Sequence, residues 1–70
     1  MDNDAKYWML EAMNLYGGSF VKNLSEAWQC ADQFNSKKLE QAFPEIMKEY
    51  IEMGKRLQVL LKEKEKSNDS

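Results

Sequence analysis

Residues 10–31 read LEAMNLYGGSFVKNLSEAWQCA, and the pair Gly17-Gly18 within this stretch decides how many helices the chain forms. Two adjacent glycines cost a helix interior roughly 2 kcal/mol relative to alanine and normally mark a break. The apolar period nevertheless runs through the pair without a change of phase, so we predict one continuous helix over residues 4–32. The alternative is a hinge at Gly17-Gly18, with Ser19 capping a second helix. The apolar stripe consists of Leu10, Met13, Gly17, Val21, Leu24, Trp28 and Ala31.

The second half of the chain predicts another helix, over residues 36–65. Pro44 lacks a backbone N–H and disfavours helical geometry at the residue before it, so we expect a kink near the start of this helix. Residues 32–36 form the expected connection between the helices, with Asn35 or Ser36 as the helix cap. The apolar positions of this half are Leu39, Phe43, Ile46, Met47, Tyr50, Met53, Gly54, Leu57, Leu60 and Leu61.

Two long helices joined by a short connection predict an all-α fold, an antiparallel two-helix hairpin. With the bend near residue 34, Gly17 would lie opposite residues 50–54, where the absence of a side chain lets two backbones approach closely. We expect a single helical domain over residues 1–66 and a disordered tail over residues 67–70.

The size of the chain points to self-association. A domain of 70 residues buries only about 60% of the surface of its unfolded chain. The single cysteine, Cys30, cannot form a disulfide within the chain, and without histidine the usual zinc-ligand spacings are absent. We therefore expect no metal or other cofactor. Burial between copies is then the expected source of added stability, in a dimer or a larger helical bundle.

Charge and hydropathy narrow the classes of partner. Ten basic and twelve acidic residues leave a net charge of −2, which does not favour binding to nucleic acid. The N-terminal residues Met1 to Asp4 lack the basic segment of a signal peptide. The longest apolar run, residues 7–10, is far shorter than the roughly 20 residues of a membrane span. We expect a cytoplasmic protein with no membrane partner.

The first helix has more apolar residues than contact with one other helix can cover. Trp8, Ala12 and Leu15 share a side of the first helix roughly opposite the core stripe, and Tyr16 follows them. Contiguous exposed apolar residues are typical of interfaces, so we predict that these four residues contact a second copy or another protein. Met9 and Lys6 are expected at its margin. The other interpretation is that the patch packs against a folded-back N-terminus.

The residues that could support catalysis lack suitable neighbours. Cys30 has no adjacent base in the sequence, and the carboxylate pair Glu45 and Glu49 lies on a solvated helix face without a cleft. We therefore predict a protein that is not an enzyme. If the helix does break at the glycines, the backbone N–H groups of Gly17, Gly18 and Ser19 could bind an anion together with Lys22.

The chain also resembles a type of very small helical protein encoded by tailed phages and prophages, over residues 7–53. The central pattern is Gly-Gly-Ser-Phe-Val at residues 17–21, followed at a distance by Ala-Phe-Pro at residues 42–44. The residues that carry the rest of the resemblance are Tyr7, Trp8, Lys22, Leu24, Ala31, Asp32, Asn35, Leu39 and Tyr50.

These proteins are generally of unknown function, so the resemblance implies a context and no specific activity. It implies an accessory phage protein that acts by binding in the bacterial cytoplasm, for example as an inhibitor of a host or defence protein. The alternatives are a nucleotide or small-ligand binder with its site between protomers, and a structural or assembly component of the phage.

Overall fold

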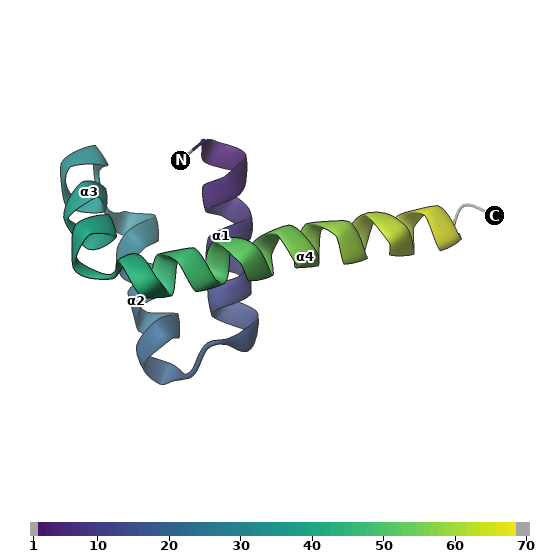
Figure 1. The fold of residues 1–70 in the computed structure, drawn as a ribbon, viewed down its shortest axis with the longest axis horizontal. Helices are drawn as coiled ribbons and strands as arrows, with labels where there is room; N and C mark the ends of the chain where they lie inside the picture. The colour runs from purple at the N-terminus through teal and green to yellow at the C-terminus, as the bar shows by residue number, and fades with distance from the viewer. Residues whose placement is uncertain (1, 69–70) are drawn as a thin grey trace.

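The structure, a computed structural model, describes residues 2–68, with side chains described as far as residue 64. The described residues form four helices and no strand, so the all-α class is confirmed. The four helices are α1 (Asn3–Tyr16), α2 (Ser19–Cys30), α3 (Gln33–Ala42) and α4 (Pro44–Asn68), which Figure 1 shows. Four helices replace the expected two, so the prediction of a two-helix hairpin is wrong.

The predicted helix over residues 4–32 breaks at the two glycines. The N–H of Gly17 donates to the carbonyl of Met13 and closes α1, and the N–H of Lys22 donates to the carbonyl of Gly18 and opens α2. Both glycines have extended backbone angles, with φ of −79° and −77°. The break turns α2 back beside α1, as Figure 1 shows, and brings Leu24 and Trp28 into the same core as α1.

The continuous apolar period misled the prediction because both helices face one core. Met13, Gly17 and Val21 are spaced by four, as in a straight helix, but Val21 packs against the cluster that contains Met13. A Cβ on Gly17 would lie 2.5 Å from the Met13 carbonyl oxygen and 2.5 Å from Cγ1 of Val21. The space that Gly17 leaves is therefore filled from its own turn, and the predicted contact with residues 50–54 is absent.

The predicted connection at residues 32–36 shortens to Ala31 and Asp32. The Oδ1 atom of Asp32 accepts a hydrogen bond from the N–H of Asn35 at 2.7 Å, so Asp32, and not Asn35 or Ser36, is the N-cap of α3. We expected a kink at Pro44, and the structure has a break between two helices at this position. Pro44 is the first residue of α4, where its missing N–H leaves no internal hydrogen bond unmade.

The core lies where α4 crosses α1. Gly54 of α4 meets the backbone of α1, because a Cβ on Gly54 would lie 2.7 Å from the carbonyl carbon and oxygen of Trp8. The buried Ser25 of α2 sits against the other side of α1 and donates to the carbonyl of Leu10 at 3.4 Å. The buried apolar residues are Met9, Leu10, Ala12, Met13, Leu24, Trp28, Tyr50 and Leu57.

The C-terminal part of α4 extends beyond the other helices, as Figure 1 shows. Leu57 is the last buried residue of α4 within the part whose side chains are described. We call residues 58–68 the arm. Residues 67 and 68, which we expected in a disordered tail, continue α4, and residues 69–70 lie outside the described residues.

Candidate protein-interaction surface

Three of the residues predicted for an interface lie at the surface of α1. Trp8 is half-buried beside Gly54, whereas Leu15 and Tyr16 are 59% and 56% exposed at the C-terminal end of the helix. Trp8 and Leu15 are seven residues apart, which is close to two full turns, so their side chains leave the same flank of α1. We call Trp8, Leu15 and Tyr16 the α1 patch.

Ala12 does not belong to this patch, because its exposed fraction is 0%. The expectation that Ala12 is exposed assumed that α1 packs on a single neighbour. In the structure α1 packs against both α4 and α2, so more of its circumference is covered than one neighbour could cover. Met9, expected at the margin of the patch, is likewise fully buried in the core.

Two further aromatic side chains, Tyr7 and Phe20, are more than half exposed. The rings of Tyr7 and Trp8 meet edge to face, with centroids 5.2 Å apart and an angle of 84°. Across the turn, Phe20 of α2 contacts Phe43 edge to face at 5.9 Å and remains largely exposed. The sequence pattern did not identify Tyr7 and Phe20 as surface residues. The run Tyr7-Trp8 was the available signal, since adjacent helical residues cannot both face the core.

The arm carries a second apolar surface that the sequence alone did not reveal. Val59, Leu60 and Leu61 are 55%, 54% and 42% exposed, although Leu60 and Leu61 continue the apolar stripe of α4. The stripe predicts burial only where another helix faces it. The described helices end short of these residues, so the final part of the stripe stays open to water.

The two surfaces carry opposite charges. Near the α1 patch, Asp4 and Glu11 lie on the same flank of α1 as Trp8 and Leu15 by the helical period. On the arm, Lys62 and Lys64 are exposed on either side of Leu61. Residues 2–16 contain three acidic residues and one lysine, whereas residues 58–64 contain two lysines and one glutamate.

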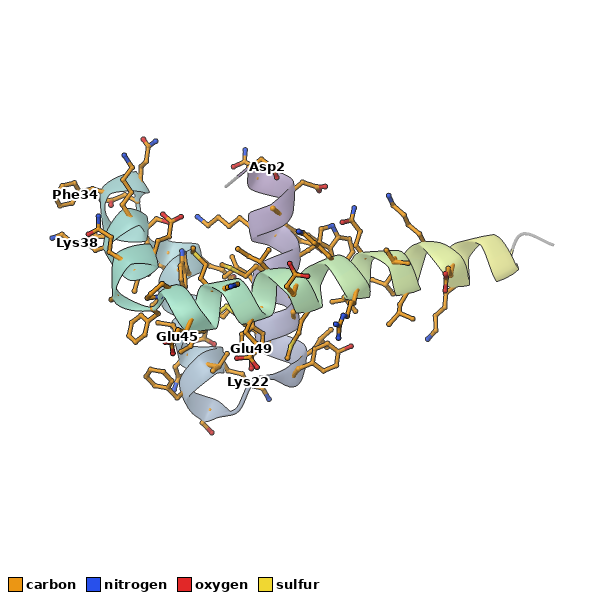
Figure 2. The ribbon with its side chains drawn as sticks, in the orientation of Figure 1. Asp2, Lys22, Phe34, Lys38, Glu45 and Glu49 are labelled. Atoms are coloured by element: carbon orange, nitrogen blue, oxygen red, sulfur yellow. The ribbon has the colours of Figure 1, made fainter. Side chains whose placement is uncertain are left out.

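The Gly17-Gly18 turn has one of the features that an anion contact requires. Gly18 is the N-cap of α2 and supplies no side-chain hydrogen bond, so the first N–H groups of this helix have no side-chain acceptor at the cap. Lys22 is exposed in the first turn, and Figure 2 shows it at this end of the molecule. Uncapped N–H groups belong to any helix start, so the anion contact of Gly17, Gly18, Ser19 and Lys22 stays a prediction.

A polar cleft of about 390 Å³ separates the start of α1 from α3. Lys6, expected at the margin of the α1 patch, lines this cleft on the opposite side of α1. Glu40 faces the same cleft, so positive and negative groups alternate around it. The complete lining is Asn3, Lys6, Gln33, Ser36, Lys37 and Glu40. Cys30 is a free, exposed thiol at the end of α2.

The described residues contain neither a candidate membrane span nor a candidate metal site. No helix among residues 2–68 combines the length and apolar character required to cross a bilayer. In the same residues, no three side chains of histidine, cysteine, aspartate or glutamate gather in a group that could hold a metal ion.

Comparisons of the chain with protein-family models, with curated proteins and with solved structures find no match.

Proposed function

We propose that this chain is a non-enzymatic accessory protein of a phage or prophage, and that it acts in the bacterial cytoplasm by binding protein. The observation that carries the binding proposal is the α1 patch. Leu15 and Tyr16 are more than half exposed beside the half-buried Trp8, on the helix that forms the centre of the fold. Apolar residues grouped in this way on a small protein are typical of an interface.

The proposal places Trp8 at the inner edge of the interface and Leu15 and Tyr16 at its centre. Aromatic residues at an interface contribute large contact area with few rotatable bonds, which limits the entropy lost on binding. Trp8 also supports the monomer, since its residue is half-buried and lies beside Ile51 and Lys55 of α4. Substitution of Trp8 therefore combines a binding defect with a folding defect, and Leu15 is the better residue for a test.

The test compares Leu15→Glu with Phe34→Glu. Phe34 is the most exposed large apolar residue at 69%, and Figure 2 shows it on the outer side of α3, away from α1. Both variants should retain the helix content and melting temperature of the parent, because neither side chain is buried. We expect Leu15→Glu to lose association with a second copy or with a protein captured from a bacterial lysate, and Phe34→Glu to retain it.

Light scattering after size exclusion would measure self-association, and affinity capture would measure binding of a foreign protein. The proposal would be overturned if Leu15→Glu left every observed association unchanged. It would also be overturned if the parent chain bound neither itself nor another protein. Equal losses with Phe34→Glu would show that added charge, and not the α1 patch, controls binding.

A further inference from the structure

Within the arm, Gln58 still lies beside Trp8 of its own chain, whereas the apolar side chains that follow it are largely exposed. The arm begins after Leu57, and its described apolar side chains, Val59, Leu60 and Leu61, are all at least 42% exposed. Eleven residues form about three turns, which span about 16 Å. The arm continues the packed helix α4 and needs no nucleation of its own, but its exposed apolar side chains offer a surface that contact with another molecule would bury.

The apolar residues of the arm divide between two faces. Leu61 follows Leu57 by four residues and Gly54 by seven, so it lies in line with the positions that pack against α1. Val59 lies on nearly the opposite face of the same helix. The exposed extension of the core-facing stripe is therefore centred on Leu61, with Leu60 beside it.

The charges beside this stripe disfavour the pairing of two arms with each other. Residues 58–68 contain three lysines and two glutamates, a net charge of +1, so two arms would repel each other weakly. The flank of α1 that carries Trp8 and Leu15 has the complementary pattern, with Asp4 and Glu11 alongside. Attraction between these charges would favour an arm on the α1 flank over an arm on an arm.

Only the first residue of the arm, Gln58, lies beside the α1 patch of its own chain, where it lines a pocket with Trp8 and Asp4. Gly54 fixes α4 across the backbone of α1 at Trp8, and the arm continues in a straight line away from this crossing, as Figure 1 shows. A second copy has no such constraint. With a twofold axis between two chains, each arm can lie along the α1 flank of the other chain.

We infer that the occupant of the α1 patch is the arm of a second copy, in a reciprocal twofold dimer. This inference rests on the proposed function and names the partner for the same surface. In such a dimer Leu61 and Leu60 of each chain cover Trp8 and Leu15 of the other. Lys62 and Lys64 then face Asp4 and Glu11 across the contact.

The first experiment compares Leu61→Ser with Val59→Ser in the full chain. The two residues lie on opposite faces of the arm and outside the core, so neither change should alter the circular dichroism of the monomer. Light scattering after size exclusion would follow the mass between about 1 µM and 1 mM protein. We expect the parent to form a dimer, Leu61→Ser to raise its dissociation constant roughly tenfold or more, and Val59→Ser to leave it unchanged.

The second experiment exchanges the charges between the two surfaces. One chain carries Lys62→Glu and Lys64→Glu, and the other carries Asp4→Lys and Glu11→Lys. Each chain alone would then have like charges on its arm and its α1 flank and should be monomeric. When the two are mixed, both contacts of the twofold dimer join opposite charges, so a heterodimer should form.

The possible outcomes separate this inference from the proposed function. A parent that stays monomeric, or a dimer unaffected by Leu61→Ser, would overturn the inference. The proposed function would still stand if Leu15→Glu abolished a different association. A dimer lost equally with Val59→Ser, or charge-exchanged chains that fail to pair when mixed, would also overturn the inference.

Discussion

Gly54 and Gly17 show how the same residue type serves two purposes in this chain. Gly54 lies inside α4, where the absence of a side chain lets the helix contact the Trp8 backbone of α1. Gly17 lies at the end of α1, and its neighbours are Met13 and Val21 from the adjoining turns. The expected close contact between helices therefore exists, but it depends on Gly54, whereas Gly17 shapes the local turn.

We expect Gly54→Ala to destabilise the fold by about 1–2 kcal/mol. Alanine favours a helix over glycine by about 1 kcal/mol, which opposes the effect. The added Cβ would nevertheless lie 2.7 Å from backbone atoms of Trp8, and these can move only if the two helices separate. Chemical denaturation followed by circular dichroism would measure the change.

Gly18→Ala provides the matched control, because a Cβ on Gly18 meets nothing within 4 Å. Its extended backbone angles suit alanine as well as glycine, but alanine is the poorer N-cap of α2, so the free energy of unfolding should fall by no more than about 0.5–1 kcal/mol. A Gly54→Ala protein as stable as Gly18→Ala would show that the crossing of α1 and α4 is looser than the structure indicates.

At the scale of the element, the four helices depend on the core to different degrees. α1 has four buried residues, Met9, Leu10, Ala12 and Met13, and it contacts both α2 and α4. α3 has none, and packs chiefly against α4. The N-cap of α3 therefore contributes a larger share of the stability of its helix than the N-cap of α1 does.

The two aspartate caps allow a direct comparison of these helices. Asp2 Oδ1 accepts from the N–H of Ala5 at 2.7 Å in α1, and Asp32 Oδ1 accepts from the N–H of Asn35 at 2.7 Å in α3. Each aspartate-to-alanine change should cost about 1 kcal/mol of helix stability. Because α3 lacks buried residues, Asp32→Ala should fray α3 locally, whereas Asp2→Ala should lower the stability of the whole domain.

Hydrogen–deuterium exchange would distinguish these two responses. Amides of residues 36–42 should exchange faster in Asp32→Ala, while those of α1, α2 and α4 remain as protected as in the parent. Asp2→Ala should reduce protection throughout the domain and most strongly near residue 5. Equal responses of the two variants would contradict the view that α3 is held mainly by its cap.

At the scale of the whole molecule, the structure combines a helical core with a projecting arm. The molecule extends over 45 × 24 × 19 Å, and its long axis follows α4 in Figure 1. The core ends at Leu57 on α4, so residues beyond it add little to the stability of a single chain. The core therefore supplies the folding stability of a single chain, whereas the arm is the part for which we propose a role in association.

We expect a chain that ends at Gln58 to fold as the parent does but to remain monomeric. At low protein concentration its melting temperature should differ from that of the parent by less than about 4 °C, since no buried side chain is lost. At high concentration the parent should become more stable than the shortened chain, because dimer formation favours the folded state. Loss of cooperative unfolding in the shortened chain would show that the arm belongs to the core of the monomer.

Local chemistry in the sequence determined the helical class and several element ends. The apolar repeat at spacings of three and four identified most buried residues, including Leu10, Met13, Leu24 and Trp28. The kink expected at Pro44 followed from the missing N–H of proline, and the structure ends α3 and begins α4 at this position. These features depend on residues within one or two helical turns, so no knowledge of the fold was required.

Only the tertiary structure decided the number of helices, the burial of Ala12 and the exposure of the arm. The apolar period is the same for one straight helix and for two helices that turn at Gly17-Gly18 and face a common core. Burial depends on which helices cover a position, and the periodicity of one helix carries no information about where its neighbours end. For this reason Ala12, expected at the surface, is buried on a helix that packs against both α2 and α4, and Leu61, expected on the apolar stripe, is 42% exposed.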